Sequence, residues 1–113
     1  MDNIIERGLL FDFYGELLTP HQQKIYGEII YNDLSLSEMS EQEGISRQGI
    51  HDLVKRCDRQ LQEYESRLGL VQRFQKIKVE ADRMSKIIDS DSFASPELKE
   101  KLRASLKSIV EDL

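Results

Sequence analysis

The segment from Thr19 to Leu61 carries three consecutive helix starts, and each is marked by a capping hydroxyl. In the first two, a Glu or Gln follows three residues later, which makes a capping box for the free N–H groups of the first turn. The capping residues are Thr19 with its partner Gln22, Ser35 with its partner Glu38, and Ser46 alone. Pro20 also fits the first position of a helix. Starts this close together predict short helices joined by tight turns.

The turn before the longest predicted helix is defined by Gly44, since glycine tolerates the left-handed conformation that often ends a helix. Beyond it, apolar residues recur at spacings of three and four. They are Ile50, Val54, Cys57, Leu61, Tyr64 and Leu68. This spacing predicts one helix from Ser46 to Leu68 with a single apolar edge, which Gly69 then interrupts. Two short helices, a glycine turn and a longer helix are typical of a helix-turn-helix.

Helices are also predicted on both sides of this motif, from Asn3 to Leu17, after Gly69, and from Ser95 onward, with a loop over Asp89–Ser95 before the last. The expected apolar stripes are Ile5, Leu9, Leu10, Phe13, Tyr14 and Leu17 in the first helix; Ile25, Tyr26, Ile29 and Ile30 in the second; Leu36 and Met39 in the third; Phe74, Ile77, Ala81, Met84 and Ile88 in the fifth; and Leu98, Leu102, Leu106, Ile109 and Leu113 in the last. Sustained strand-like alternation is absent. We therefore predict an all-α fold, with a helix-turn-helix domain over residues 1–70 and a C-terminal helical extension over residues 71–113.

The apolar stripes beyond Leu61 leave two arrangements open. The later helices could pack back on the fourth helix, or they could form a homodimer interface. A homodimer would place two fourth helices side by side, as in dimeric readers of DNA.

The length and composition favour a cytoplasmic protein. No apolar run approaches the ~20 residues of a membrane span, and the N-terminal segment lacks the basic start of a signal peptide. The single cysteine, Cys57, cannot form an internal disulfide. Its place on the apolar stripe favours a small core residue over a reactive thiol.

The fourth helix has one face that is free for solvent or a partner if Ile50, Leu53 and Val54 pack against the second and third helices. The candidate contact residues are Arg47, Gln48, His51, Asp52, Lys55, Arg56 and Arg59. Arg and Gln near the start of such a helix can bond guanine and adenine edges, and later Lys and Arg side chains can hold phosphates. A nucleic-acid contact, a protein contact and a plain solvated surface all fit this pattern.

The charge balance opposes a nucleic-acid partner. The chain has a formal net charge of −5, whereas affinity for DNA depends largely on bases that neutralise phosphates. From Ser46 to Gln60 there are four Lys or Arg residues and two Asp residues, a local charge of +2. One of these acids, Asp52, lies within the candidate face itself.

The sequence predicts no catalytic, cofactor-binding or metal-binding residues. His21, His51 and Cys57 are not at ligand spacing, and neither a glycine-rich phosphate loop nor a nucleophile motif occurs. The carboxylates fall on hydrated faces instead of pairing in an apolar pocket. We therefore expect a non-enzymatic protein.

Two family resemblances are carried by specific motifs. Residues Thr19 to Leu61 resemble region 4 of bacterial sigma factors in the stretches LLTPHQQKIYGEIIY, LSLSEMSEQEGIS and RQGIHDLVKRCDRQL. The longer stretch from Leu9 to Leu70 resembles the YlxM-type family of small Gram-positive proteins. Its motifs are FDFYGELLT, the tyrosine-rich second helix and the ending YESRL.

The resemblance implies a stand-alone module like sigma region 4 with a helical extension. It also implies a regulatory or adaptor role in the signal recognition particle pathway, with the particle's protein or its receptor as candidate partners. The sigma-like groove-facing positions are Arg47, Gln48, His51, Asp52 and Lys55. We rank the targeting-pathway regulator or adaptor first, and a sequence-specific DNA-binding transcriptional regulator as the alternative.

Overall fold

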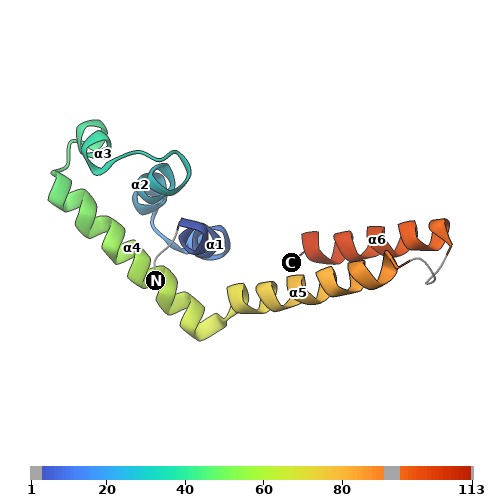
Figure 1. The fold of residues 1–113 in the computed structure, drawn as a ribbon. Coiled ribbons are helices and arrows are strands. Elements are labelled where there is room, and N and C mark those ends of the chain that lie inside the picture. Colours follow the sequence, from blue (N-terminus) through green and yellow to red (C-terminus); the bar gives the residue numbers. More distant parts are fainter. Residues whose placement is uncertain (1–3, 91–94, 113) are drawn as a thin grey trace. The chain divides into compact units, whose positions relative to one another are not determined.

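The computed structural model describes residues 4–90 and 95–112. Its elements are α1 (Ile4–Tyr14), the 3₁₀ helix η1 (Gly15–Leu17), α2 (Pro20–Tyr31), α3 (Leu36–Glu43), α4 (Arg47–Leu68), α5 (Leu70–Ile88) and α6 (Pro96–Glu111), as drawn in Figure 1. Within these ranges no strand occurs, so the predicted all-α class is confirmed. Asn3, residues 91–94 of the predicted loop, and Leu113 lie outside the described ranges. The chain divides into two compact units after Val71.

Both predicted capping boxes are confirmed. At the start of α2, the Gln22 N–H donates to the Thr19 hydroxyl at 3.2 Å, and the Gln22 side chain accepts the Thr19 N–H at 3.0 Å. At the start of α3, Ser35 and Glu38 make the same reciprocal pair, at 3.1 and 3.0 Å. These bonds pair N–H groups that have no partner within their own helices.

The predicted helix-turn-helix is confirmed at its turn. Gly44 ends α3 in the left-handed conformation, with φ of 67°, and its N–H donates to the Ser40 carbonyl at 3.0 Å. Ile45 is partly buried against the core. Ser46 then caps α4 by accepting the Gly49 N–H at 3.0 Å. The turn therefore spans only the three residues 44–46, and both helix ends are fixed by local bonds.

In the first unit, α1, α2 and α3 cover one side of α4 (Figure 1). Between them lies the core, which consists of Leu10, Tyr14, Leu18, Ile25, Tyr26, Ile30, Met39, Ile50, Val54, Cys57, Leu61 and Val71. The inward residues predicted for α2 and α3 are confirmed, with Ile29 and Leu36 partly buried. The first four residues of the predicted α4 stripe are confirmed as well.

Two predictions for the first helix are wrong. Leu17 is 55% exposed and Leu18 is buried in its place, because the chain tightens into η1 after Tyr14 and a 3₁₀ turn has fewer residues than an α-helical turn. Ile5 is 74% exposed. It lies about 140° around α1 from the buried Leu10, since successive residues of an α-helix are about 100° apart.

Leu68, the last residue of the predicted α4 stripe, is also exposed, at 51%. Gly69 adopts a φ of 62° and ends α4 with its N–H bonded to the Glu65 carbonyl at 2.8 Å. Beyond this glycine, Val71 is buried in the core of the first unit. The predicted interruption at Gly69 is confirmed.

The start of α5 is tied to α1 by a small hydrogen-bond cluster. The Leu70 N–H donates to the Tyr14 hydroxyl at 3.0 Å, and the Val71 N–H donates to Glu65 Oε1 at 3.0 Å. The Tyr14 hydroxyl itself donates to Glu65 Oε1 at 2.5 Å. Burial and then the bond to Glu65 raise the pKa of Tyr14, so its phenol stays protonated at neutral pH. Two side chains from earlier helices thus cap α5.

The second unit contains α6 and nearly all of α5. Figure 1 shows α6 running back along α5, and Arg103 on α6 donates to Asp89 just beyond α5. On the predicted stripes, Ile88 is buried, Phe74, Ile77, Ala81, Leu102 and Leu106 are half-buried, and Met84, Leu98 and Ile109 are exposed. The last three stripe predictions are therefore wrong, because two helices shield only the side chains along their line of contact. No helix in the described ranges is long and apolar enough for a membrane span.

Candidate nucleic-acid or partner interface

The candidate interface is the face of α4 opposite the core. Ile50, Cys57 and Leu61 are fully buried on the inner edge, and Val54 is 7% exposed. The outer side chains are all exposed, namely Arg47, Gln48, His51, Asp52, Lys55, Arg56 and Arg59. We call these seven residues the α4 face. Their exposure leaves them available for contact, and their role in binding stays a prediction.

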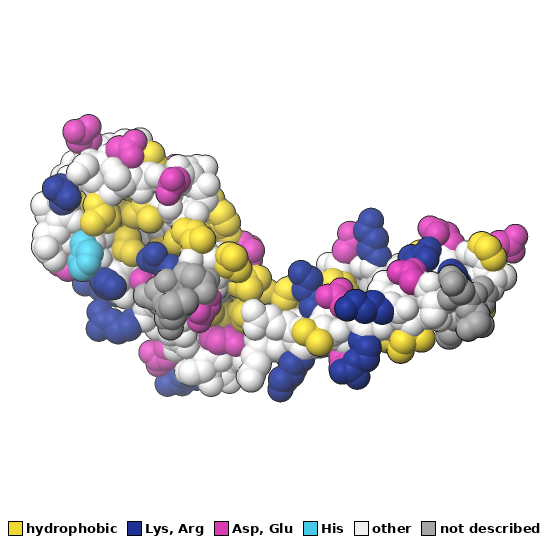
Figure 2. Space-filling view, viewed as in Figure 1, with side chains coloured by type: hydrophobic (Ala, Val, Ile, Leu, Met, Phe, Trp, Pro, Cys, Tyr) yellow, Lys and Arg dark blue, Asp and Glu magenta, His cyan; other side chains and the backbone are white. Residues whose placement is uncertain are grey.

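Lys and Arg side chains gather along the N-terminal part of α4 in Figure 2, whereas Asp and Glu side chains gather over α3. One of these carboxylates, that of Glu43, has cationic or polar neighbours on α2. Lys24 lies 3.0 Å from it and His21 lies 3.6 Å from it. Opposite charges are therefore separated between two surfaces of the same small unit.

Asp52 makes local contacts on the α4 face. Gln48 Nε2 donates to Asp52 Oδ1 at 2.9 Å, and His51 Nδ1 lies 3.7 Å from the same oxygen. No Lys or Arg is paired with this carboxylate by these contacts, and it is 61% exposed. Asp52 therefore keeps a negative charge on the face and opposes binding to phosphates nearby.

Asp58 behaves differently, although it comes from the same helix. Arg7 on α1 donates from Nε to Asp58 Oδ1 at 3.1 Å and from Nη2 to Oδ2 at 3.0 Å. The Tyr26 hydroxyl on α2 donates to Oδ1 at 2.5 Å. Burial and then the bond to Asp58 raise the pKa of Tyr26, so its hydroxyl remains a donor. Asp58 is thus compensated inside the fold.

This pairing changes the charge balance of α4. The seven residues of the α4 face include four Lys or Arg and one Asp, a net charge of +3 with neutral His51. Asp58 lies beside this face, and its pairing with Arg7 compensates the one further acid of the helix segment from Arg47 to Gln60. This pairing has no local sequence signal, because Arg7 and Asp58 are 51 positions apart.

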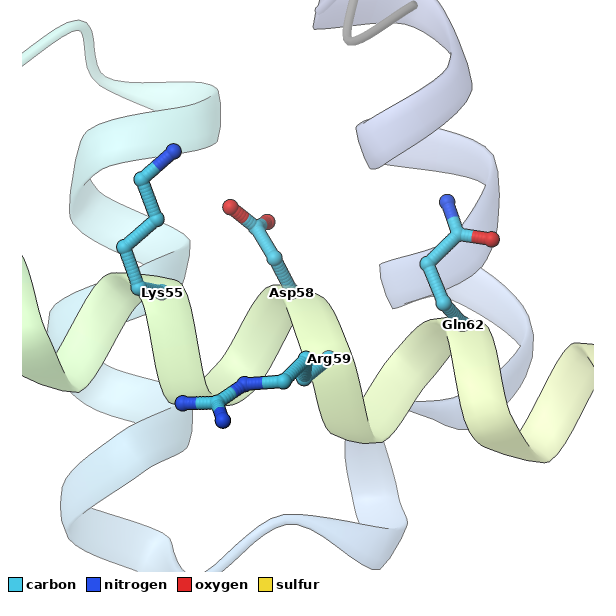
Figure 3. A pocket seen from close by; sticks show the side chains of 4 residues that line it. All are labelled: Lys55, Asp58, Arg59 and Gln62. Carbon is cyan, nitrogen blue, oxygen red and sulfur yellow. The ribbon is translucent and has the colours of Figure 1, made fainter.

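Two shallow hollows lie along this side of α4. Lys55, Asp58, Arg59 and Gln62 line the one in Figure 3. Leu36, Arg47, Gln48 and His51 line the other, at the start of the helix. Both are open to solvent, so they suit contact with a macromolecular surface better than the enclosure of a small molecule.

Cys57 lies on the inner edge of α4 and is fully buried. Burial and then the neighbouring Asp58 charge raise the pKa of its thiol to about 11. Its predicted place in the core is confirmed, and the neutral thiol packs there as a small apolar group.

The comparisons with known proteins agree with this fold. Residues 1–104 match the UPF0122 family, described as "Putative helix-turn-helix protein, YlxM / p13 like". A UPF0122 protein of Thermoanaerobacter sp. strain X514 is 44% identical over 88 residues, which is 78% of this chain and 75% of the relative. One of Symbiobacterium thermophilum is 40% identical over 89 residues, covering 79% and 83%. One of Desulforamulus reducens is 39% identical over 104 residues, covering 91% and 89%. The chain therefore belongs to the UPF0122 family of YlxM/p13-like helix-turn-helix proteins.

Proposed function

We propose that this chain is a cytoplasmic, non-enzymatic regulator that binds duplex DNA through the α4 face. The observation that carries the proposal is the net charge of +3 on the exposed α4 face, beside which the one further acid, Asp58, is compensated by Arg7. The overall charge of −5 arises elsewhere, including the exposed carboxylates of α3. A locally cationic helix can bind phosphates even when the whole chain is acidic, since salt screens distant charges.

The chemistry of the face suits the usual division of contacts in a helix-turn-helix. Arg47 and Gln48 lie in the first turn of α4, where recognition helices reach base edges. Lys55, Arg56 and Arg59 lie further along, where they would contact phosphates. The exposed carboxylate of Asp52 would repel nearby phosphates. We therefore expect weak binding with a strong dependence on salt.

The double variant Lys55→Ala/Arg59→Ala tests this function. Loss of two phosphate contacts should weaken duplex binding on the order of tenfold at low salt and reduce the slope of log K against log salt by about two. Fluorescence anisotropy over a salt series measures both quantities, with labelled DNA from the upstream region of the protein's own operon and a scrambled duplex.

The matched control is Lys101→Ala/Lys107→Ala on α6, which removes the same charge from two exposed positions in the second unit. Equal losses in the two double variants would mean that only total charge matters, against a specific role for α4. The proposed function fails if neither duplex binds the wild-type protein with a Kd below ~10 μM at low salt. This threshold is lenient, because non-specific binding alone commonly reaches such Kd values.

A protein partner in the signal recognition particle pathway is the second candidate function. It is favoured by the resemblance to YlxM-type proteins and by the exposed carboxylates of Glu38 and Glu41 on α3. An acidic surface can meet a basic protein by electrostatic complementarity. In this case the chain would act as an adaptor or regulator of protein targeting, with the particle's protein or its receptor as partner.

Direct titration separates this candidate from the first. We expect the purified particle protein or its receptor to bind the wild-type chain in nuclease-treated samples, and Glu41→Lys to weaken that binding because it reverses one charge on α3. Isothermal titration calorimetry measures the affinity, with Lys101→Glu as a charge reversal outside α3. Absence of heat with both proteins at tens of micromolar would exclude a stable complex, since such concentrations exceed the Kd of most specific pairs.

A further inference from the structure

We propose that Arg7 is a positioning residue for the α4 face, because it holds the carboxylate of Asp58 away from the phosphates that Lys55 and Arg59 would bind. This inference rests on the proposed DNA-binding function. It adds that a residue of α1 controls the charge next to the DNA-contacting residues of α4. The control acts through two helices that are far apart in the sequence and packed together in the fold.

The Arg7–Asp58 contact is a bidentate salt bridge. The guanidinium donates from two nitrogens to the two carboxylate oxygens, at 3.1 and 3.0 Å, and such forked pairs fix direction as well as charge. The side chains are only 22% and 18% exposed. Tyr26 completes the set, since its hydroxyl donates to Asp58 and its ring lies 5.5 Å from the Arg7 guanidinium carbon. Asp58 therefore has three donors inside the first unit.

The same carboxylate lies next to the bases that would bind DNA. Asp58 shares the shallow hollow with Lys55 and Arg59, and Figure 3 shows Lys55 and Asp58 rising from the same side of α4. Residues three apart on a helix are neighbours. Without Arg7, the free carboxylate could pair with Lys55 or repel a phosphate bound there. Either outcome would weaken a polyanion contact.

A purely structural pair would behave in another way. If Arg7 only stabilised the packing of α1 on α4, its loss would act through the folded fraction, and neutralising Asp58 would not restore binding in a folded variant. Rescue by a second substitution therefore distinguishes electrostatic positioning from stability.

The experiment compares the wild type, Arg7→Met, Asp58→Asn and the double variant at several salt concentrations. Methionine keeps an apolar stem near Tyr26 and favours a helix. We expect Arg7→Met to weaken duplex binding roughly threefold to tenfold at low salt, because it adds an uncompensated charge beside two bases. Asp58→Asn should bind as tightly as the wild type or more tightly. The double variant should return to within about twofold of the wild type, since no extra charge is left.

Two results would overturn the inference while leaving the proposed function intact. One is a folded Arg7→Met variant with wild-type affinity, and the other is a double variant as weak as Arg7→Met. Circular dichroism and thermal unfolding establish which variants are folded at the assay temperature. If Arg7→Met does not fold, Arg7→Lys replaces it in the cycle. Lysine keeps the charge but loses the fork, so it should give a smaller loss of affinity that Asp58→Asn again restores.

If the wild type binds no duplex, a measurement without DNA can still test whether Arg7 controls the electrostatic potential at the α4 face. The relaxation of amide protons by a cationic and an anionic nitroxide of equal size reports the local electrostatic potential. At Lys55 and Arg59 we expect a more negative potential in the Arg7 variant than in the wild type, and recovery in the double variant. An unchanged potential would overturn the positioning role, whereas failure of duplex binding alone would overturn only the proposed function.

Discussion

We expect Leu61→Ala to lower the free energy of unfolding of the first unit by about 2–5 kcal/mol, the range for removing a buried leucine side chain and leaving a cavity. Leu61 is fully buried on the inner edge of α4, within the core that α1 and α2 help to form. Urea denaturation followed by circular dichroism measures the change, which should appear as a lower midpoint with little change in slope.

Leu68→Ala is the matched control, because Leu68 follows Leu61 by one heptad on the same predicted stripe yet is 51% exposed. We expect this change to cost no more than about 0.5 kcal/mol, as for other exposed positions. Similar losses at the two positions would contradict the observed exposure of Leu68. They would mean that α4 buries its whole apolar stripe.

The second large effect is expected at the capping cluster of α5. Glu65→Ala removes the acceptor shared by the Tyr14 hydroxyl and the Val71 N–H, and Tyr14 is only 1% exposed. Leaving a buried donor unpaired costs about 1–3 kcal/mol. We therefore expect a loss of stability of that order, together with faster amide exchange at Leu70 and Val71. Hydrogen exchange followed by NMR measures both amides directly.

Two control variants define the origin of this effect. Glu65→Gln keeps an oxygen acceptor without the charge, so it should lose less stability than Glu65→Ala. Glu63→Ala removes an exposed carboxylate that lies 3.2 Å from Arg67, and an exposed pair of this kind contributes only about 0.3–0.5 kcal/mol. If Glu65→Ala matched Glu63→Ala in stability and in amide exchange, the capping cluster would have no energetic role.

Features decided by neighbouring residues were predictable from the sequence. The caps at Thr19, Ser35 and Ser46 bond to N–H groups only three positions later in the sequence. The turn at Gly44 depends on the conformation of that one residue. The exposed positions of the α4 face followed from helical periodicity once the buried edge was recognised.

Features decided by tertiary packing were not predictable. Nothing local signals that the chain tightens at Gly15–Leu17 and buries Leu18, or that Val71 is buried while Leu68 is exposed. The pairing of Arg7 with Asp58 depends on the approach of α1 to α4, which a single sequence does not specify. The charge count along α4 therefore included an acid that the fold compensates.

The burial of Cys57 has a practical consequence, because it is the only cysteine in the chain. A thiol reagent in solution cannot reach a fully buried sulfur whose proton is also held more tightly than usual. Modification must therefore wait until α4 separates from the helices that cover it. The rate at which Cys57 is modified therefore reports how often the core opens. Mass spectrometry can measure this rate in the natural protein, without an introduced label.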